Sequence, residues 1–145
     1  MSSAITDSFT ADHHRCDLLL AEAERQLAGG DWTAAGEAVT GLVTAMAHHF
    51  SLEEGVLFPE LAQVFKVAEN PIEVMVGEHA QMRALFADLE QAVTDRDQVN
   101  GRGVLETLHF LVQQHNYKEE GVLYAMADGA LPERGAAIAD QLAGG

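Results

Sequence analysis

The stretch HHFSLEEGVLFPEL, residues 48–61, decides the fold of this chain. Its apolar residues recur at the three- and four-residue steps of a helix, and Pro59 stands near the end of the pattern. His49 and Glu53 are four residues apart, so both lie on one helix face, and this face is expected to point inward. An imidazole and a carboxylate inside a helical protein need a partner that compensates for lost water.

The same helical pattern continues along nearly the whole chain. No stretch shows the sustained two-residue alternation of a strand. Asp31 is the expected N-cap of the second helix, and Pro71 is the expected first position of the third. We predict an all-α, up-down-up-down four-helix bundle with a short C-terminal tail, 133–142, that forms an extra helix. The chain, 1–145, is predicted to be one domain, with core helices at about 10–28, 31–63, 71–94 and 98–127.

Composition argues against several classes of protein. The net charge of -15 repels nucleic acids and anionic lipids. No apolar run reaches the roughly 20 residues of a membrane helix, and the first residues lack the pattern of a secretory signal. The single cysteine, Cys16, has no partner for an internal disulfide. We expect a cytoplasmic protein without nucleic-acid or membrane partners, and the sequence predicts no particular protein partner.

The second half of the chain repeats the first at an offset of 66 residues, without a gap. The string EEGVL occurs in both halves, at 53–57 and 119–123. Three pairs of residues with metal-binding side chains coincide at this offset: His13 with His79, His49 with His115, and Glu53 with Glu119. Two helical hairpins related by a pseudo-twofold axis would bring these residues to one shared centre.

The repeated residues predict a dinuclear metal centre. A single His-x-x-x-Glu pair is usually a surface pair or a hydrogen-bonded core histidine, but surface pairs have no reason to recur at a fixed offset. Two carboxylates can bridge two ions while imidazoles complete their coordination, and nitrogen and oxygen donors without a thiolate favour iron over a structural zinc site. The predicted ligands are His13, His49, Glu53, His79, His115 and Glu119.

Four segments resemble the signatures of the hemerythrin-like, or HHE cation-binding, family. The resemblance covers nearly the whole chain and implies a four-helix bundle around a non-heme di-iron centre, two iron ions with an oxo or hydroxo bridge. Carried over by motif, it implies the same six ligands. The segments are DHHRCD (12–17), HFSLEE (49–54) followed by VLFPEL, EHAQMR (78–83) and QQHNYKEEGVLY (113–124).

The sequence departs from the oxygen-carrying hemerythrins at two positions. Those proteins place a histidine one turn before the ligand of the third helix, where this chain has Met75. They also use His-x4-Asp in the fourth helix, where this chain has His-x-x-x-Glu, formed by His115 and Glu119. The resulting set of four histidines is similar to that of bacterial di-iron proteins that repair iron–sulfur centres after nitrosative or oxidative stress. Those usually carry an additional cysteine-containing N-terminal domain, which this sequence lacks.

We therefore predict a non-heme di-iron protein that binds dioxygen, nitric oxide or peroxide at a centre of four histidines and two glutamates. It would act as a sensor, a scavenger or an oxidative-stress protein. The alternatives are an iron-handling module that stores, delivers or repairs iron centres, and a bundle in which the metal is purely structural. Whether the protein is also an enzyme that processes peroxide or nitric oxide stays open at this point.

Residues beside the predicted ligands have other expected roles. His14 and His48 lie about 100° around the helix from a ligand and are expected to stay outside the centre. Glu54 and Glu120 are expected to form salt bridges outside the core, with contact to a ligand as the alternative.

Two further acidic residues and several packing residues complete the set. Asp12 and Glu78 are candidates to hold an imidazole through its other ring nitrogen, although Asp12 could equally cap a helix. Packing roles are expected for seven residues: Cys16, Trp32, Phe50, Phe58, Met82, Tyr117 and Tyr124.

Overall fold

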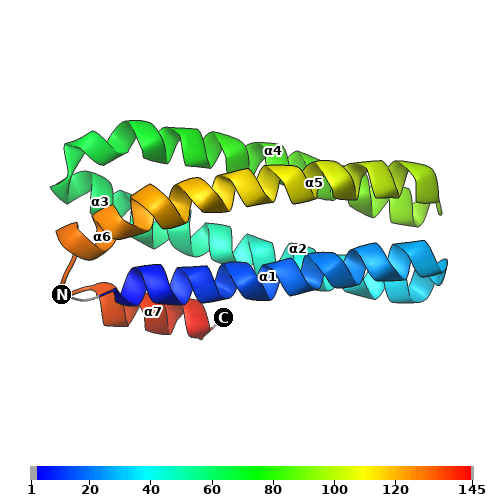
Figure 1. Cartoon of the computed structure of the whole chain (residues 1–145), viewed down its shortest axis with the longest axis horizontal. Helices are drawn as coiled ribbons and strands as arrows, with labels where there is room; N and C mark the ends of the chain where they lie inside the picture. The colour runs from blue at the N-terminus through cyan, green and yellow to red at the C-terminus, as the bar shows by residue number, and fades with distance from the viewer. Residues whose placement is uncertain (1–2, 145) are drawn as a thin grey trace.

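A computed structural model describes residues 3–144, and within this range the regular elements are helical (Figure 1). Four long rods lie side by side in alternating directions, which confirms the predicted all-α, up-down-up-down bundle. The rods are α1 (Ala4–Gly29); α2 (Trp32–Leu52), continued by η1 (Glu53–Leu57) and α3 (Phe58–Val64); α4 (Glu69–Thr94); and α5 (Gln98–Lys118), continued by η3 (Glu119–Leu123) and α6 (Tyr124–Ala130). A short 3-10 turn, η2 (Lys66–Ala68), leads into α4.

Local capping residues fix several helix ends. The side chain of Asp31 accepts a hydrogen bond from the backbone N–H of Ala34, 3.1 Å away, as expected for the N-cap of α2. Asp97 caps α5 in the same way, through the N–H of Asn100 at 3.0 Å. α1 ends at Gly30, whose φ of 77° lies in the left-handed region that glycine adopts without strain.

Two helices begin earlier than the sequence predicts. α1 begins at Ala4 instead of near residue 10, because Asp128 of α6 accepts hydrogen bonds from the first-turn N–H groups of Ile5 and Thr6 at 3.0 and 3.1 Å. α4 begins at Glu69, so Pro71 is the third residue of this helix and not the first. Its missing N–H is still harmless, because the first turn has no carbonyl partner for it.

The core consists of two apolar clusters. One lies toward the α1–α2 turn and includes Leu27, Leu42 and Leu105. The other lies toward the opposite end and includes Ile5 and Leu61. Each fully buried side chain of this size contributes about 1.5–3 kcal/mol, so both clusters stabilise the bundle strongly. The six predicted metal ligands belong to neither apolar cluster. They form a polar layer between the two clusters.

The predicted C-terminal helix is present as α7 (Gly135–Ala143). It packs against α1 and α2, and Figure 1 shows it alongside the first half of α1. Its Ile138 is fully buried. Its two ends are fixed by polar contacts: Arg134 donates two hydrogen bonds to Glu60 of α3, and His48 Nε2 donates to the carbonyl oxygen of Leu142 at 3.0 Å.

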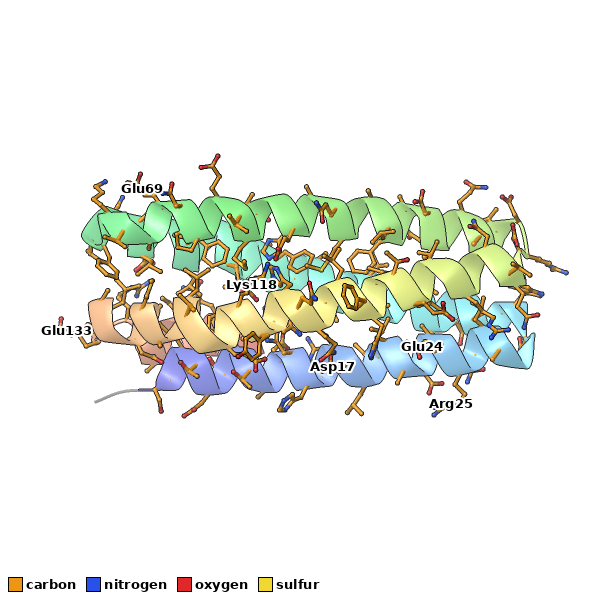
Figure 2. The ribbon with its side chains drawn as sticks, turned by 45° about the horizontal axis from the view of Figure 1, so that its top comes forward. Asp17, Glu24, Arg25, Glu69, Lys118 and Glu133 are labelled. Atoms are coloured by element: carbon orange, nitrogen blue, oxygen red, sulfur yellow. The ribbon has the colours of Figure 1, made fainter. Side chains whose placement is uncertain are left out.

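Most charged side chains point away from the bundle, as Arg25, Glu69 and Glu133 do in Figure 2. Tyr117 was expected to pack, but this prediction is wrong: the side chain is 81% exposed on the outer face of α5. The predicted packing of Trp32 is confirmed, since its half-buried ring lies against the first apolar cluster. Among the described residues, none of the helices is long and apolar enough to cross a membrane.

Candidate metal centre

The six predicted ligands meet in the middle of the bundle. None of their side chains lies at the surface, and the most accessible, His13, is only 4% exposed. Each comes from a different element, so the bundle has to form before the cluster exists. In chain order they are His13 of α1, His49 of α2, Glu53 of η1, His79 of α4, His115 of α5 and Glu119 of η3.

The six side chains form two overlapping groups. Within each group one ligand atom per residue lies within 4.8 Å of the others, which is close enough for a single ion to reach all four. Glu53 and Glu119 belong to both groups. The group that also contains His13 and His49 is called the first group, and the group that also contains His79 and His115 is called the second group.

Glu53 connects the two groups with its two carboxylate oxygens. Its Oε2 atom lies 3.4 Å from Nε2 of His49, in the first group. Its Oε1 atom lies 3.1 Å from Nε2 of His79, in the second group. One oxygen therefore faces each group, which is the arrangement of a carboxylate that bridges two ions.

Glu119 repeats this arrangement from the opposite helix. Its Oε1 atom lies 3.1 Å from Nε2 of His13, and its Oε2 atom lies 3.1 Å from Nε2 of His115. The pseudo-twofold relation between the two halves of the chain, inferred from the sequence repeat, thus holds for the bridging residues.

Two buried oxygens show that the donor set fits metal ions. Glu53 Oε1 and Glu119 Oε2 are shielded from water, and within residues 3–144 they have no hydrogen-bond partner while the Nε2 atoms of His79 and His115 that face them carry no proton. Such atoms cost free energy unless a cation or donor satisfies them. In the second group, Nε2 of His79 lies 3.2 Å from Nε2 of His115. Two imidazole lone pairs tolerate this approach only with a cation or a proton between them.

All four histidines are held from behind by a second set of carboxylates. A carboxylate only accepts hydrogen bonds, so the Nδ1 atom of each imidazole carries the proton and Nε2 is left to face an ion. This is the usual support of a metal-binding histidine. The pairs are His13 with Glu120 at 2.7 Å, His49 with Asp12 at 2.7 Å, His79 with Glu54 at 2.6 Å, and His115 with Glu78 at 2.8 Å.

These pairs correct one prediction and decide between the alternatives for two other residues. Glu120 was expected to form a salt bridge outside the core, but it holds His13 instead. Glu54 does form the expected salt bridge, with Arg83, and holds His79 with the same carboxylate. Asp12 does not cap a helix, because α1 begins eight residues earlier, at Ala4, and Asp12 faces α2 from inside it.

Both bridging glutamates stand at the start of a π-helical turn that the sequence did not predict. The turns are η1 and η3, and both have the sequence EEGVL. π turns are wider than α turns and occur often at functional sites. The only signal in the sequence is the repetition of the string itself, since neither turn contains a proline or another residue that requires this geometry.

Tyr124 packs in the second apolar cluster, as predicted, but its hydroxyl has a further role that the sequence analysis did not predict. The ring is fully buried, but its hydroxyl enters the first group. It donates to Glu53 Oε2 at 2.6 Å, with Glu119 Oε1 at 2.9 Å as a second acceptor. The hydroxyl oxygen also lies 3.0 Å from His13 Nε2 and 3.3 Å from His49 Nε2. Tyr124 is therefore a further polar member of the centre.

The second group has an aromatic ring without a hydroxyl in the corresponding place. Phe58 is the counterpart of Tyr124 at the 66-residue offset, and its ring centroid lies 6.1 Å from that of His79. Phe50 stacks on the same imidazole at 3.9 Å. The predicted packing roles of both phenylalanines are thus confirmed, and the repeat already contained the Tyr-for-Phe difference that makes the two groups unequal.

Without metal, protons on His49 and His79 balance the charge of the buried carboxylates. Burial lowers the pKa of His49, but the charge of Glu53 and the hydrogen bond to Asp12 outweigh this effect and raise the pKa to about 10. Burial likewise opposes protonation of His79, but hydrogen bonds to Glu119 and Glu53 raise its pKa to about 9. Burial raises the pKa of Glu119, yet hydrogen bonds from His115 and two other histidines hold it well below its usual value.

The remaining candidates stay outside the centre. His14 is exposed, and His48 serves α7, so neither joins the two groups, as predicted. Met82 is fully buried and Cys16 is 3% exposed, which agrees with their predicted packing roles. Burial, followed by the charge of Asp12, raises the pKa of the Cys16 thiol to about 12, so this side chain stays protonated.

Comparison with known proteins agrees with this geometry. A search of curated proteins and a search of solved structures found no significant match. The family described as "Hemerythrin HHE cation binding domain" matches residues 4–127, a range that contains both groups of ligands and ends before α7. The chain therefore belongs to the hemerythrin HHE cation-binding domain family.

Proposed function

We propose that the centre holds two iron ions and binds a small molecule, which is dioxygen, nitric oxide or peroxide, as a sensor, scavenger or oxidative-stress protein. The observation that supports this proposal is that Glu53 and Glu119 belong to both groups of potential ligands. A single structural ion would need only one such group. Two groups joined by two carboxylates are suited to a pair of ions that act together.

The choice of iron rests on the chemistry of the donor atoms. Each group offers two imidazole nitrogens and two carboxylate oxygens, and none offers a thiolate. Imidazole and carboxylate together are typical ligands of non-heme iron. When bound, a pair of iron ions would supply redox chemistry and the ability to coordinate a diatomic molecule.

The two groups differ in the space they leave for such a molecule. Four protein donors leave an octahedral ion short of ligands. In the first group the hydroxyl of Tyr124 lies close to both histidine nitrogens and fills part of this space. In the second group Phe58 offers no polar atom. We therefore assign the open coordination position to the second group, beside His79 and His115.

Burial argues against the alternative of an iron-handling module. All six donor residues are at most 4% exposed, and each histidine is also held by a hydrogen bond from behind. An ion could leave only after several of these contacts opened together. Ready exchange of iron, which storage or delivery would need, is not favoured by such a site.

Metal analysis and optical spectra test the proposal. After iron-replete expression, elemental analysis should find two iron ions per chain, and a value of one or fewer with all ligands intact would refute the dinuclear centre. The spectrum of the reduced protein should change on addition of dioxygen, nitric oxide or peroxide. Rapid loss of iron to a weak chelator would favour iron handling, and inertness to every addition would favour a structural role.

The identity of the partner and the location also remain our proposals. We propose that the partner is one of these small molecules and that neither nucleic acid nor membrane binds, since the chain has a net charge of -15. Cytoplasmic location stays a prediction from the sequence, as does the single domain.

A further inference from the structure

An apolar pocket of about 210 Å³ opens at the surface between α4 and η3. Val74 and Val122 stand at its mouth, where they are 53% and 46% exposed. Met75 and Leu123 form its floor and are almost completely buried. Pro71 and Lys118 complete the lining.

The lining offers almost no polar atom to a molecule inside the pocket. Five of the six residues have apolar side chains. The exception is Lys118, but its ammonium group is bound to Glu78, so that its aliphatic stem is left to line the pocket. Figure 2 shows Lys118 on the side of α5 that faces α4. Water and ions would gain no hydrogen bonds here in exchange for those they lose.

The floor of the pocket adjoins the second group of the centre. Met75 lies four residues, about one turn, before His79 on α4, and Leu123 lies four residues after Glu119 on η3. At the rim, Lys118 binds Glu78, which in turn holds His115. His79 and Glu119 are therefore one turn away from residues of the pocket, and His115 is linked to Lys118 through Glu78.

The corresponding place in the first half of the chain is closed. α7 packs against α1 and α2, and its ends are fixed on either side of η1, through Glu60 of α3 and His48 of α2. Val56 is half-buried, whereas Val122 is exposed. The counterparts of three pocket residues are Ile5 for Pro71, Phe9 for Met75 and Val56 for Val122. The C-terminal helix thus covers one of two equivalent grooves and leaves the other open.

We propose that this pocket is the path by which an apolar diatomic molecule, dioxygen or nitric oxide, reaches the second group, with Met75 as the side chain it passes. This inference rests on the proposed function and narrows it, because an apolar path favours apolar gases over peroxide, which is polar. Peroxide would have to give up its hydrogen bonds to water, whereas an apolar gas enters an apolar cavity readily. The flexible thioether side chain of Met75 can move aside without a change in the backbone.

Xenon binding tests the pocket without any redox chemistry. Xenon is an apolar probe that occupies cavities of this kind. Crystals of the metal-loaded protein under xenon pressure should show a xenon atom between Val74, Met75 and Val122. A Val74→Trp variant should lose this atom, because the larger side chain fills the mouth. Absence of xenon from the pocket in the unmodified protein would overturn the inference.

The rate of gas binding tests the path itself. In stopped-flow experiments, Val74→Trp should slow the binding of nitric oxide to the reduced iron-loaded protein by about tenfold, with an unchanged final spectrum. Val76→Trp is the matched control, since Val76 lies on the same helix, is 38% exposed and does not line the pocket. The reaction with peroxide should not slow in either variant.

The outcomes separate this inference from the proposed function. If the unmodified protein gives no spectral change with dioxygen, nitric oxide or peroxide, the proposed function fails. If the unmodified and Val74→Trp proteins bind nitric oxide at the same rate, only the proposed path fails. Equal slowing of nitric oxide and peroxide in Val74→Trp would show a path without the proposed selectivity and would overturn that part of the inference.

Discussion

Tyr124 and Phe58 occupy the same position in the two halves of the repeat, and only Tyr124 carries a hydroxyl group into the centre, 2.6 Å from Glu53 Oε2. The two bridging glutamates and the four histidines follow the pseudo-twofold relation, and this pair breaks it. The difference is large in electrostatic terms, because a buried hydroxyl supplies a hydrogen bond where a phenyl ring supplies none. The two groups of potential ligands are therefore chemically unequal, although each contains two histidines and the same two glutamates.

Replacing Tyr124 with phenylalanine should make the two groups alike. The ring stays packed, but Glu53 and Glu119 lose a hydrogen-bond donor. We expect both ions to be retained and the affinity for the more weakly held ion to fall by about 10- to 100-fold, as for other supporting residues. Competition with a chromophoric chelator measures this change. Unchanged affinity would mean that the hydroxyl plays no part in holding the bridging carboxylates.

The cluster of six histidine and glutamate side chains could be predicted from the sequence because the helix repeat and the 66-residue offset act together. A spacing of four residues puts His49 and Glu53 on one face, and the same spacing at His115 and Glu119 gives the second half of the centre. Neither spacing depends on the conformation of a loop. The fold followed from the same pattern, since four long helical stretches with short connections have few other arrangements.

Features that depend on contacts between distant segments could not be predicted. The start of α1 at Ala4 depends on Asp128, more than 120 residues away along the chain, as the separations of 123 and 122 residues show. The sequence could not decide between a salt bridge and contact with a ligand for Glu54 and Glu120. A carboxylate beside a ligand can face solvent or a neighbouring helix, and only helix packing decides which. The π turns have no local signal at all.

The bridging and the supporting carboxylates should respond differently to substitution. Glu53→Ala removes one donor from each group, so metal affinity should fall by more than about 100-fold, beyond the range of a supporting residue. Glu54→Gln weakens only the hydrogen bond behind His79 and should cost about 10- to 100-fold. Equilibrium dialysis followed by elemental analysis compares the two variants.

His14→Ala is the matched control for these substitutions. His14 is exposed and lies directly beside His13, so its removal should leave metal content and affinity unchanged. If His14→Ala lost as much metal as His13→Ala, the wrong histidine of the pair would have been assigned to the centre.

Removal of the metal should lower the stability of the whole bundle. The six ligands come from six different elements, so metal binding holds all four rods together. A ligand present at 1,000 times its Kd stabilises the folded state by about 4 kcal/mol, which corresponds to a shift in Tm of about 10 °C for a domain of this size. Differential scanning calorimetry before and after dialysis against a chelator measures the shift. Equal Tm values would show that the bundle forms independently of the ions.

The metal-free protein should lose stability at high pH, because the raised pKa values of His49 and His79 couple folding to proton uptake. Their pKa values are about 10 and about 9 in the folded state, against a usual 6.5, so their contribution is complete below pH 6.5 and disappears as the pH rises through 9 and 10. Glu119, whose pKa is lowered, contributes above its usual 4.5 and loses this contribution as the pH falls below that value. Urea unfolding of the metal-free protein should therefore show a free energy of unfolding that falls between pH 7 and 10.

The metal-loaded protein should lose less stability over this range, because bound ions replace the imidazole protons and bind more tightly as competing protons leave. A metal-free protein whose stability does not change between pH 7 and 10 would contradict the proposed charge balance in the centre.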